Sequence, residues 1–130
     1  MCLEKLDDTT KQAKVGYKLF STPNKRSKLF RTSWKSYPMY MNRWYTDVAT
    51  TMISTGSHRY RTGFHVYRLK RDAVRVAKRF GEIVIKVEMQ HIFTSGTQKM
   101  GNWDKPADVL VAQRIALREV VADYSKDWAE

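Results

Sequence analysis

The chain has few cysteines and lacks long apolar runs, and each of these shortages excludes a class of protein. Cys2 is the only cysteine among 130 residues, which excludes an internal disulfide framework and favours a reducing compartment. No apolar run approaches the roughly 18–20 residues that a membrane span needs, so we expect no membrane partner. The opening residues MCLEKLDDTT carry early acids and no apolar segment, and they therefore do not predict a signal peptide. Together these features predict a cytoplasmic protein.

Acidic residues are scarce in one part of the chain. Between Lys14 and Arg79 there are 16 lysines and arginines against two acids, Asp47 and Asp72, a balance of +14. The segment Phe80–Glu130 has a balance of −2, and the whole chain carries +11. A positive field this concentrated attracts phosphate-bearing ligands or an acidic protein surface. The plainer interpretation is that the charge serves solubility and non-specific attraction to polyanions.

Length and apolar content set the scale of the fold. At 130 residues with 42% hydrophobic residues, the chain predicts one domain with its own core. Residues 1–14 and 119–130 are candidates for loose ends. The oligomeric state stays open, and a homo-oligomer is one of the options.

The segment Gly63–Met89 organises the rest of the chain. Phe64–Arg68 is rich in strand-forming residues, and apolar residues then recur at helical spacing over Leu69–Phe80. Gly81 suits the left-handed residue that ends a helix, and Ile83–Met89 alternates apolar and polar residues as a strand does. The two strands of such a unit normally run parallel. We therefore predict an α+β domain with a mixed or mostly antiparallel sheet and one main helix packed on a face.

Other segments give weaker signals. Short strands are predicted over Gly16–Phe20 and around Leu29–Phe30. The contiguous apolar residues within Asp108–Leu117 favour a strand that is buried on both faces. Small and polar residues predict irregular loops over Thr46–Thr62 and His91–Pro106.

Basic residues cluster on the outer half of the predicted helix, where one acid, Asp72, accompanies them. The cations are Lys70, Arg71, Arg75, Lys78 and Arg79. Arg59 and Arg61 lie in a run with two glycines and several hydroxyls, whose backbone N–H groups suit an anion-binding nest. We predict that phosphate is held by Arg59, Arg61, Arg71 and Arg75.

Aromatic residues are interleaved with these cations, and a base can stack on such a ring while a cation holds its phosphate. Most of the rings are expected in the core, because large aromatic side chains supply much of a small domain's burial. We predict base stacking on Trp44, Tyr45 or Tyr60. The hydroxyls and flexible backbone of Ser95, Gly96 and Thr97 are predicted to close the site.

Catalytic signals are sparse. His65 lies in a predicted strand and Glu88 on its neighbour, so the two could form an acid–base pair, although a structural histidine is the favoured interpretation. One cysteine and three histidines lack the spacing of metal ligands. We predict no metal site, no cofactor and no catalytic residues, and we lean against an enzyme.

The MCL start, the GYKLF strand, the GFHVY element, the VIKVEM strand and the late SGT and VLVA segments resemble small uncharacterised phage-encoded accessory proteins. The resemblance follows most of the chain in order. It implies a host-takeover or counter-defence role in the bacterial cytoplasm. Several such proteins are non-enzymatic. Some sequester nucleotide second messengers, and others bind host proteins or nucleic acid.

The segments FHVYRLKRDAVRVAKRF and VIKVEM are also distantly similar to small ADP-ribosyltransferases. That resemblance implies that Glu88 would polarise a ribose. The early catalytic His or Arg of that family has no counterpart here apart from Lys18.

The leading hypothesis from the sequence is a non-catalytic, phage-type protein that sequesters a small nucleotide. Three alternatives accompany it. The first is a nucleic-acid-binding protein that uses the basic face of the helix. The second is an inhibitor that docks on an acidic host protein, and the third is an enzyme similar to ADP-ribosyltransferases.

Overall fold

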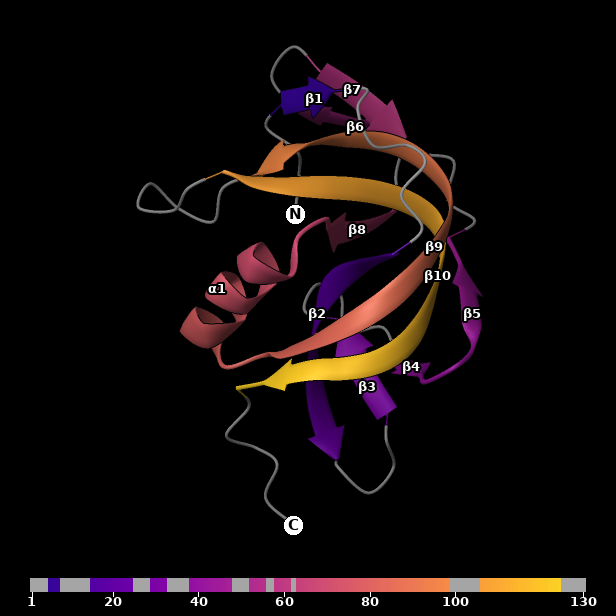
Figure 1. The fold of residues 1–130 in the computed structure, drawn as a ribbon. Helices are drawn as coiled ribbons and strands as arrows, with labels where there is room; N and C mark the ends of the chain where they lie inside the picture. Colours follow the sequence, from indigo (N-terminus) through magenta and orange to yellow (C-terminus); the bar gives the residue numbers. More distant parts are fainter. Residues whose placement is uncertain are drawn as a thin grey trace.

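The structure is a computed structural model, which describes residues 5–7, 15–24, 29–32, 38–47, 52–55, 58–61, 63–98 and 106–124. A mostly antiparallel sheet dominates it, and one helix lies against the sheet (Figure 1). In chain order the elements are β1 (Lys5–Asp7), β2 (Val15–Asn24), β3 (Leu29–Thr32), β4 (Pro38–Tyr40), β5 (Trp44–Thr46), β6 (Met52–Thr55), β7 (His58–Arg61), β8 (Phe64–Tyr67), α1 (Lys70–Phe80), β9 (Ile83–Gln98) and β10 (Ala107–Asp123). The described part therefore agrees with the predicted α+β class at a coarse level.

The main sheet has eight strands in the order β1-β9-β10-β8-β2-β3-β4, with β5 paired to β10. The strand β2 also pairs with β9, so β9, β10, β8 and β2 form a closed circuit of paired strands. Both β8 and β9 run antiparallel to β10 and are thus parallel to each other, as the strand–helix–strand pattern predicts. A separate antiparallel pair is formed by β6 and β7.

The strand β9 is long and strongly bent, as is its partner β10 (Figure 1). His91 has a positive φ of 56°, and the pairing with β10 shifts register beside it, between Val111 and Ala112. An extra residue in one strand bends the strand and increases its twist. The first half of β9 can therefore pair with β2, while the second half pairs with β1.

Two stretches that were predicted as loops form strands. Within Thr46–Thr62, β6 and β7 make a hairpin, since strand-forming residues flank Gly56 and Ser57, a turn-type dipeptide outside the described residues. Within His91–Pro106, the first eight residues continue β9. Their small and polar side chains do not predict a strand, but the backbone pairs on both edges, with β1 and with β10. The strand β10 likewise continues through Asp123, into the segment predicted as a loose end.

Burial on both faces of the sheet explains the contiguous apolar runs. The inner core cluster contains alternate strand residues such as Ile83, Ile85 and Val87 together with Leu110 and Ala112. A second cluster lies on the helix side of the sheet and contains residues that alternate with these. Its buried members are Leu19, Tyr67, Ala73, Val76, Ala77, Val84, Ala107, Val109 and Val111. The prediction of a strand buried on both faces within Asp108–Leu117 is confirmed.

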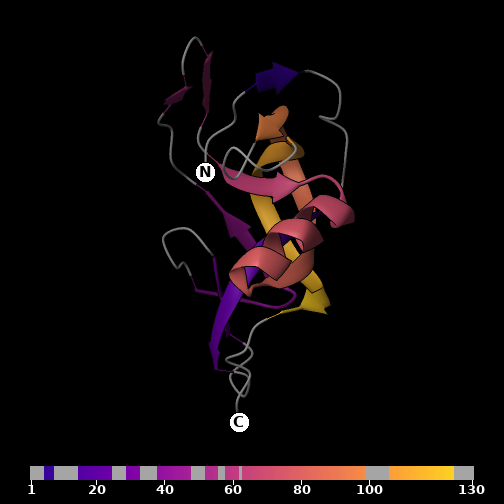
Figure 2. The ribbon, with the colours of Figure 1, turned by 90° about the vertical axis from the view of Figure 1, so that its left-hand side faces the viewer.

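The helix α1 covers the second cluster, and Figure 2 shows it in front of the bent strands. Its own residues Ala73, Val76 and Ala77 are buried against the sheet, as the apolar stripe predicts. Gly81 ends the helix with φ 65° and ψ 45°, a left-handed conformation that glycine adopts without a Cβ clash. Phe80 differs from the prediction, because this last helical residue is 53% exposed.

Gly16 marks a close approach of β2 to the core. A Cβ atom there would lie 2.4 Å from Cγ1 of Val66 and 2.9 Å from the carbonyl oxygen of Tyr67. We expect Gly16→Ala to lower the free energy of unfolding by about 1–3 kcal/mol, because packed cores accommodate added atoms only by strain. Urea denaturation followed by circular dichroism measures the change.

Val15→Ala is the matched control, since Val15 is 37% exposed on the same strand. We expect this control to stay within about 0.5 kcal/mol of the parent. Equal stability of Gly16→Ala and the parent would contradict the close approach.

Candidate functional site

The first candidate surface is the outward side of α1, which we call the α1 face and define as Lys70, Arg71, Arg75, Lys78 and Arg79. Ala73, Val76 and Ala77 point toward the sheet, so the cations on the other side of the helix point away from it. Lys70, Arg71, Lys78 and Arg79 are exposed, and Arg75 is half-buried. At 100° per residue, Arg71, Arg75 and Lys78 follow one line along the helix, and a rise of 1.5 Å per residue makes that line about 10 Å long.

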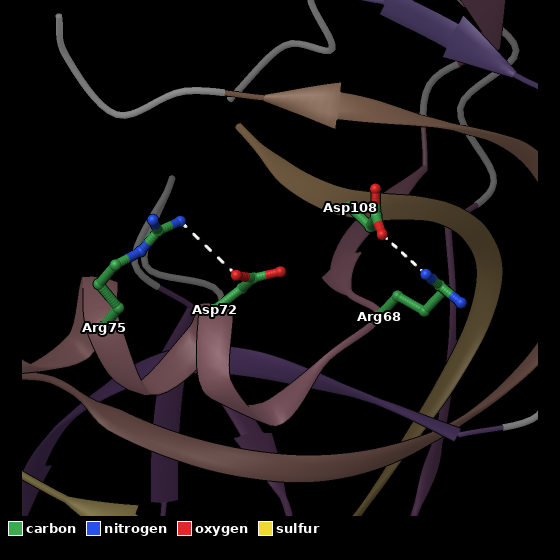
Figure 3. A network of polar contacts seen from close by, with 4 residues as sticks. All are labelled: Arg68, Asp72, Arg75 and Asp108. Carbon is green, nitrogen blue, oxygen red and sulfur yellow. Dashed lines mark hydrogen bonds and ion pairs between the residues drawn. The ribbon is translucent and has the colours of Figure 1, made fainter. Parts of the chain in front are cut away.

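Local contacts compensate only part of this charge (Figure 3). Arg75 lies 3.6 Å from Asp72 one turn earlier. Just before the helix, Arg68 contacts Asp108 of β10 at 2.7 Å and ties the start of α1 to the sheet. The ammonium of Lys78 lies 5.7 Å from the centre of the Tyr124 ring. The α1 face therefore keeps a concentration of positive charge in contact with solvent.

The second candidate surface is the Trp44 cluster, which we define as Tyr40, Arg43, Trp44, Arg114 and Arg118. The guanidinium carbons of Arg114 and Arg118 lie 5.0 Å and 5.5 Å from the centre of the Trp44 ring. The guanidinium of Arg43 lies 5.1 Å from the centre of the Tyr40 ring. Each contact is within the range of a cation–π interaction.

Strand register explains why these side chains meet. Trp44 of β5 is paired with Ala116 of β10, and Ala116 is paired with Glu88 of β9 on its other edge. Arg114 lies two residues before Ala116 and shares its face of the strand. A register shift between Leu117 and Glu119 makes Arg118 the extra residue of a bulge, and its guanidinium lies over the Trp44 ring as that of Arg114 does.

Hydrogen bonds hold the arginines of the Trp44 cluster in place. Arg118 donates to Glu88 at 3.0 Å and to the side-chain oxygen of Asn42 at 3.1 Å. Arg114 donates to the side-chain oxygen of Gln90 at 2.6 Å. Asn42 has a φ of 60°, a conformation that asparagine tolerates better than most residues. The guanidinium groups of Arg114 and Arg118 are therefore oriented before any ligand arrives.

The predicted site residues do not all come together. Arg71 and Arg75 share α1, while Trp44 and Tyr45 lie on β5, on the opposite side of the bent strands (Figure 1). The hydroxyl of Tyr45 accepts a hydrogen bond from the backbone N–H of Tyr40 at 2.7 Å, and its ring packs against the inner core. Tyr45 is thus partly a core residue.

The remaining predicted residues lie on other elements. Ser95, Gly96 and Thr97 are consecutive residues of β9 that pair with both β1 and β10, and Gly96 is buried. The backbone of Arg59, Tyr60 and Arg61 belongs to β7. The side chains of these three residues lie outside the described part of the structure.

Sequence reasoning missed the arginines that accompany Trp44. Arg114 and Arg118 lie two residues to either side of Ala116, a spacing that places all three on one face of a strand. That pattern was readable in the sequence. Their meeting with Trp44, 70 residues earlier, depends on the pairing of β5 with β10.

The residues weighed for catalysis are separated. Glu88 contacts Arg118 at 3.0 Å on the outer side of β9, and this ion pair gives the carboxylate a structural partner. His65 is 8% exposed on β8, where it is paired with Val111. The sequence hypothesis of an acid–base pair between His65 and Glu88 therefore receives no support from the geometry.

Metal ligands do not gather in the residues that the structure describes, where no three His, Cys, Asp or Glu side chains form a group that could hold an ion. The described part also contains no helix that is long and apolar enough to cross a membrane.

Comparison with protein-family models, curated proteins and solved structures found no match for the chain. The resemblances to phage accessory proteins and to ADP-ribosyltransferases, which depend on short motifs, therefore stay predictions.

Two buried groups have strongly lowered pKa values. Lys18 is paired with Ile85 on the inner side of the sheet, and its ammonium donates to the carbonyl oxygen of His65 at 2.8 Å. Burial lowers the pKa of Lys18 from 10.5 to about 8, against the opposing attraction of Glu82. Burial and then the charge of Lys18 lower the pKa of His65 from 6.5 to about 3, which keeps its ring neutral at neutral pH.

Lys18 makes stability depend on alkaline pH. The pKa of Lys18 is about 8 in the folded protein, against an ordinary value of 10.5. Between pH 8 and pH 10.5 the unfolded chain therefore binds more protons than the folded protein does. We expect the free energy of unfolding to rise between pH 8 and pH 10, by about 1–2 kcal/mol from this group. Urea denaturation at several pH values measures it, and Lys18→Met should remove most of the rise.

Lys86→Met is the control for Lys18, since Lys86 lies on the opposite face of β9. This variant should keep the slope of the parent. An unchanged slope in Lys18→Met would show that its ammonium is not buried as described.

His65 makes stability depend on acidic pH. Because its pKa is about 3 in the folded protein, the unfolded chain takes up the extra proton as pH falls through 6.5. We expect the free energy of unfolding to fall from pH 6.5 to pH 4, by up to about 1.4 kcal/mol per pH unit from this group. His65→Gln should give a flatter profile in the same denaturation series, and a profile parallel to the parent would contradict the assignment.

Proposed function

We propose that this protein binds nucleic acid and that the α1 face makes the contacts to phosphate. The observation that supports this most is the exposure of four of its five cations on a helix whose opposite side is packed on the sheet. Neutralising phosphates with such cations releases condensed counterions, and this release supplies much of the affinity of sequence-independent binding.

The shape of the α1 face favours a polymer over a small nucleotide. Its cations point outward along a convex helix over about 10 Å rather than converging on one point. A sealed nucleotide site would need the predicted phosphate and base contacts side by side. However, α1, which carries Arg71, and β5, which carries Trp44, lie on opposite sides of the bent strands (Figure 1). Sequestration of a small nucleotide is therefore the weaker proposal.

The biological setting is part of the proposal. A phage-encoded accessory protein that binds nucleic acid could act during takeover of a host or against its defences. The same positive surface would also suit an acidic host protein. Affinity for nucleic acid and its dependence on salt separate these two partners, because only the first predicts counterion release from a phosphate polymer.

The test uses the full chain and a fluorescein-labelled 20-base-pair DNA duplex, with anisotropy measured at several salt concentrations. The α1 variant Arg71→Gln/Lys78→Gln removes two exposed cations and leaves the contact of Arg75 with Asp72. We expect its affinity to fall about tenfold or more at low salt. The slope of log affinity against log salt should fall in magnitude by about two, because two phosphate contacts are lost.

The cluster variant Arg43→Gln/Arg114→Gln removes the same net charge from the other side of the sheet. It should retain most of the duplex affinity, which separates a local contact from a general effect of net charge. Equal losses in the two variants would reduce the proposal to non-specific attraction, and unchanged binding in the α1 variant would refute it.

A further inference from the structure

We propose that the Trp44 cluster is a second nucleic-acid contact that takes the bases of a single strand. The proposal rests on the proposed function only for its class of ligand, nucleic acid, and does not depend on phosphate contacts at the α1 face. It adds the preferred form of that ligand, a single strand. It also adds a different surface, formed by the end of β4, by β5 and β10, and by the residues between β4 and β5.

The composition of the cluster fits unpaired bases. Tyr40 is 42% exposed with the guanidinium of Arg43 beside its ring, and Trp44 is half-buried beside two guanidinium groups. Unstacked bases are bound on aromatic rings and on the planes of arginine guanidinium groups. Each of the two aromatic–arginine groups thus offers a planar surface together with positive charge for the adjoining phosphate.

The two groups are joined through Asn42. Asn42, between Tyr40 and Trp44 in the chain, donates its backbone N–H to the carbonyl of Leu117 at 2.7 Å. Its side chain accepts from Arg118, which is itself bonded to Glu88. Side chains that are already held in place lose less conformational entropy when a ligand binds. The ring of Tyr40 at the end of β4 and the ring of Trp44 in β5 therefore flank a chain segment that Asn42 anchors to β10.

The charge of the cluster also favours a phosphate-bearing strand. Of the three arginines of the cluster, Arg118 forms an ion pair with Glu88, whereas Arg114 bonds to the neutral amide of Gln90 and Arg43 lies over the Tyr40 ring. The cluster thus keeps positive charge around its aromatic rings. An acidic protein would match this charge but would leave the rings without planar partners. A duplex would match it too, but the bases of a duplex are stacked on one another and are not available to the rings.

The test compares fluorescein-labelled oligo(dT) of 20 nucleotides with the 20-base-pair duplex, using anisotropy on the full-length parent and its variants. Trp44→Leu removes one stacking ring, and the cluster variant Arg43→Gln/Arg114→Gln leaves both rings in place. We expect each to weaken single-strand binding by about tenfold or more and duplex binding by less than about twofold. Trp44→Phe should restore much of the loss, because phenylalanine also offers a π-face.

Thermal melting of every variant checks that the fold is retained. Because Trp44 also contacts Arg114 and Arg118, a destabilised Trp44→Leu would leave the surface cluster variant as the deciding protein. That variant changes one exposed and one half-buried arginine and leaves the bond of Arg118 to Glu88 intact.

The outcomes separate the two proposals. Loss of single-strand binding alone in the cluster variants supports the inference, even if the α1 variant leaves duplex binding unchanged and the helix proposal fails. Unchanged single-strand binding in well-folded cluster variants overturns the inference, and loss of both probes in the α1 variant would then leave the proposed function standing. Absence of binding to either probe by the parent overturns both and points to an acidic protein as the partner.

Discussion

The pairing of β9 along both of its edges is the constraint on which the rest of the structure depends. One edge is hydrogen-bonded to β10 along most of its length, and the other is shared between β2 and β1. A regular strand would run past one of these partners. The left-handed residue His91 and the neighbouring bulge bend β9, so that both are reached and the circuit of β9, β10, β8 and β2 closes.

The elements on either side of the bent strands determine where the positive charge is exposed. The helix-side cluster is covered by α1, so the cations of the helix must face solvent on one side of the molecule. On the other side β5 pairs with β10, and the guanidinium groups of Arg114 and Arg118 lie over the Trp44 ring. Two positive surfaces of different character result. One is a plain cationic helix, and the other combines rings with oriented guanidinium groups.

Lys18 is a charged residue on the inner side of the closed circuit of strands. Its ammonium lies on the inner side of the sheet and donates to a carbonyl of β8, where the described pairing of β2 with β8 is limited to Tyr17 and Tyr67. The Lys18 side chain thus makes a hydrogen bond between β2 and β8 at a point beyond the described backbone pairing of these strands. Burial is the cost, and it lowers the pKa of Lys18 to about 8 and, with the lysine charge, that of His65 to about 3.

The sequence by itself determined the local elements whose periodicity is strong. The apolar stripe and Gly81 define α1 to within a residue, and the alternation from Ile83 to Met89 assigns each side chain to its face, because these signals arise from neighbours in the chain. Only the tertiary structure decided that Ser95–Thr97 belong to a strand, since their small side chains carry no strand signal and their partners lie elsewhere. It likewise decided that Trp44 meets Arg114 and Arg118 rather than Arg71, because strand register across 70 residues places them together.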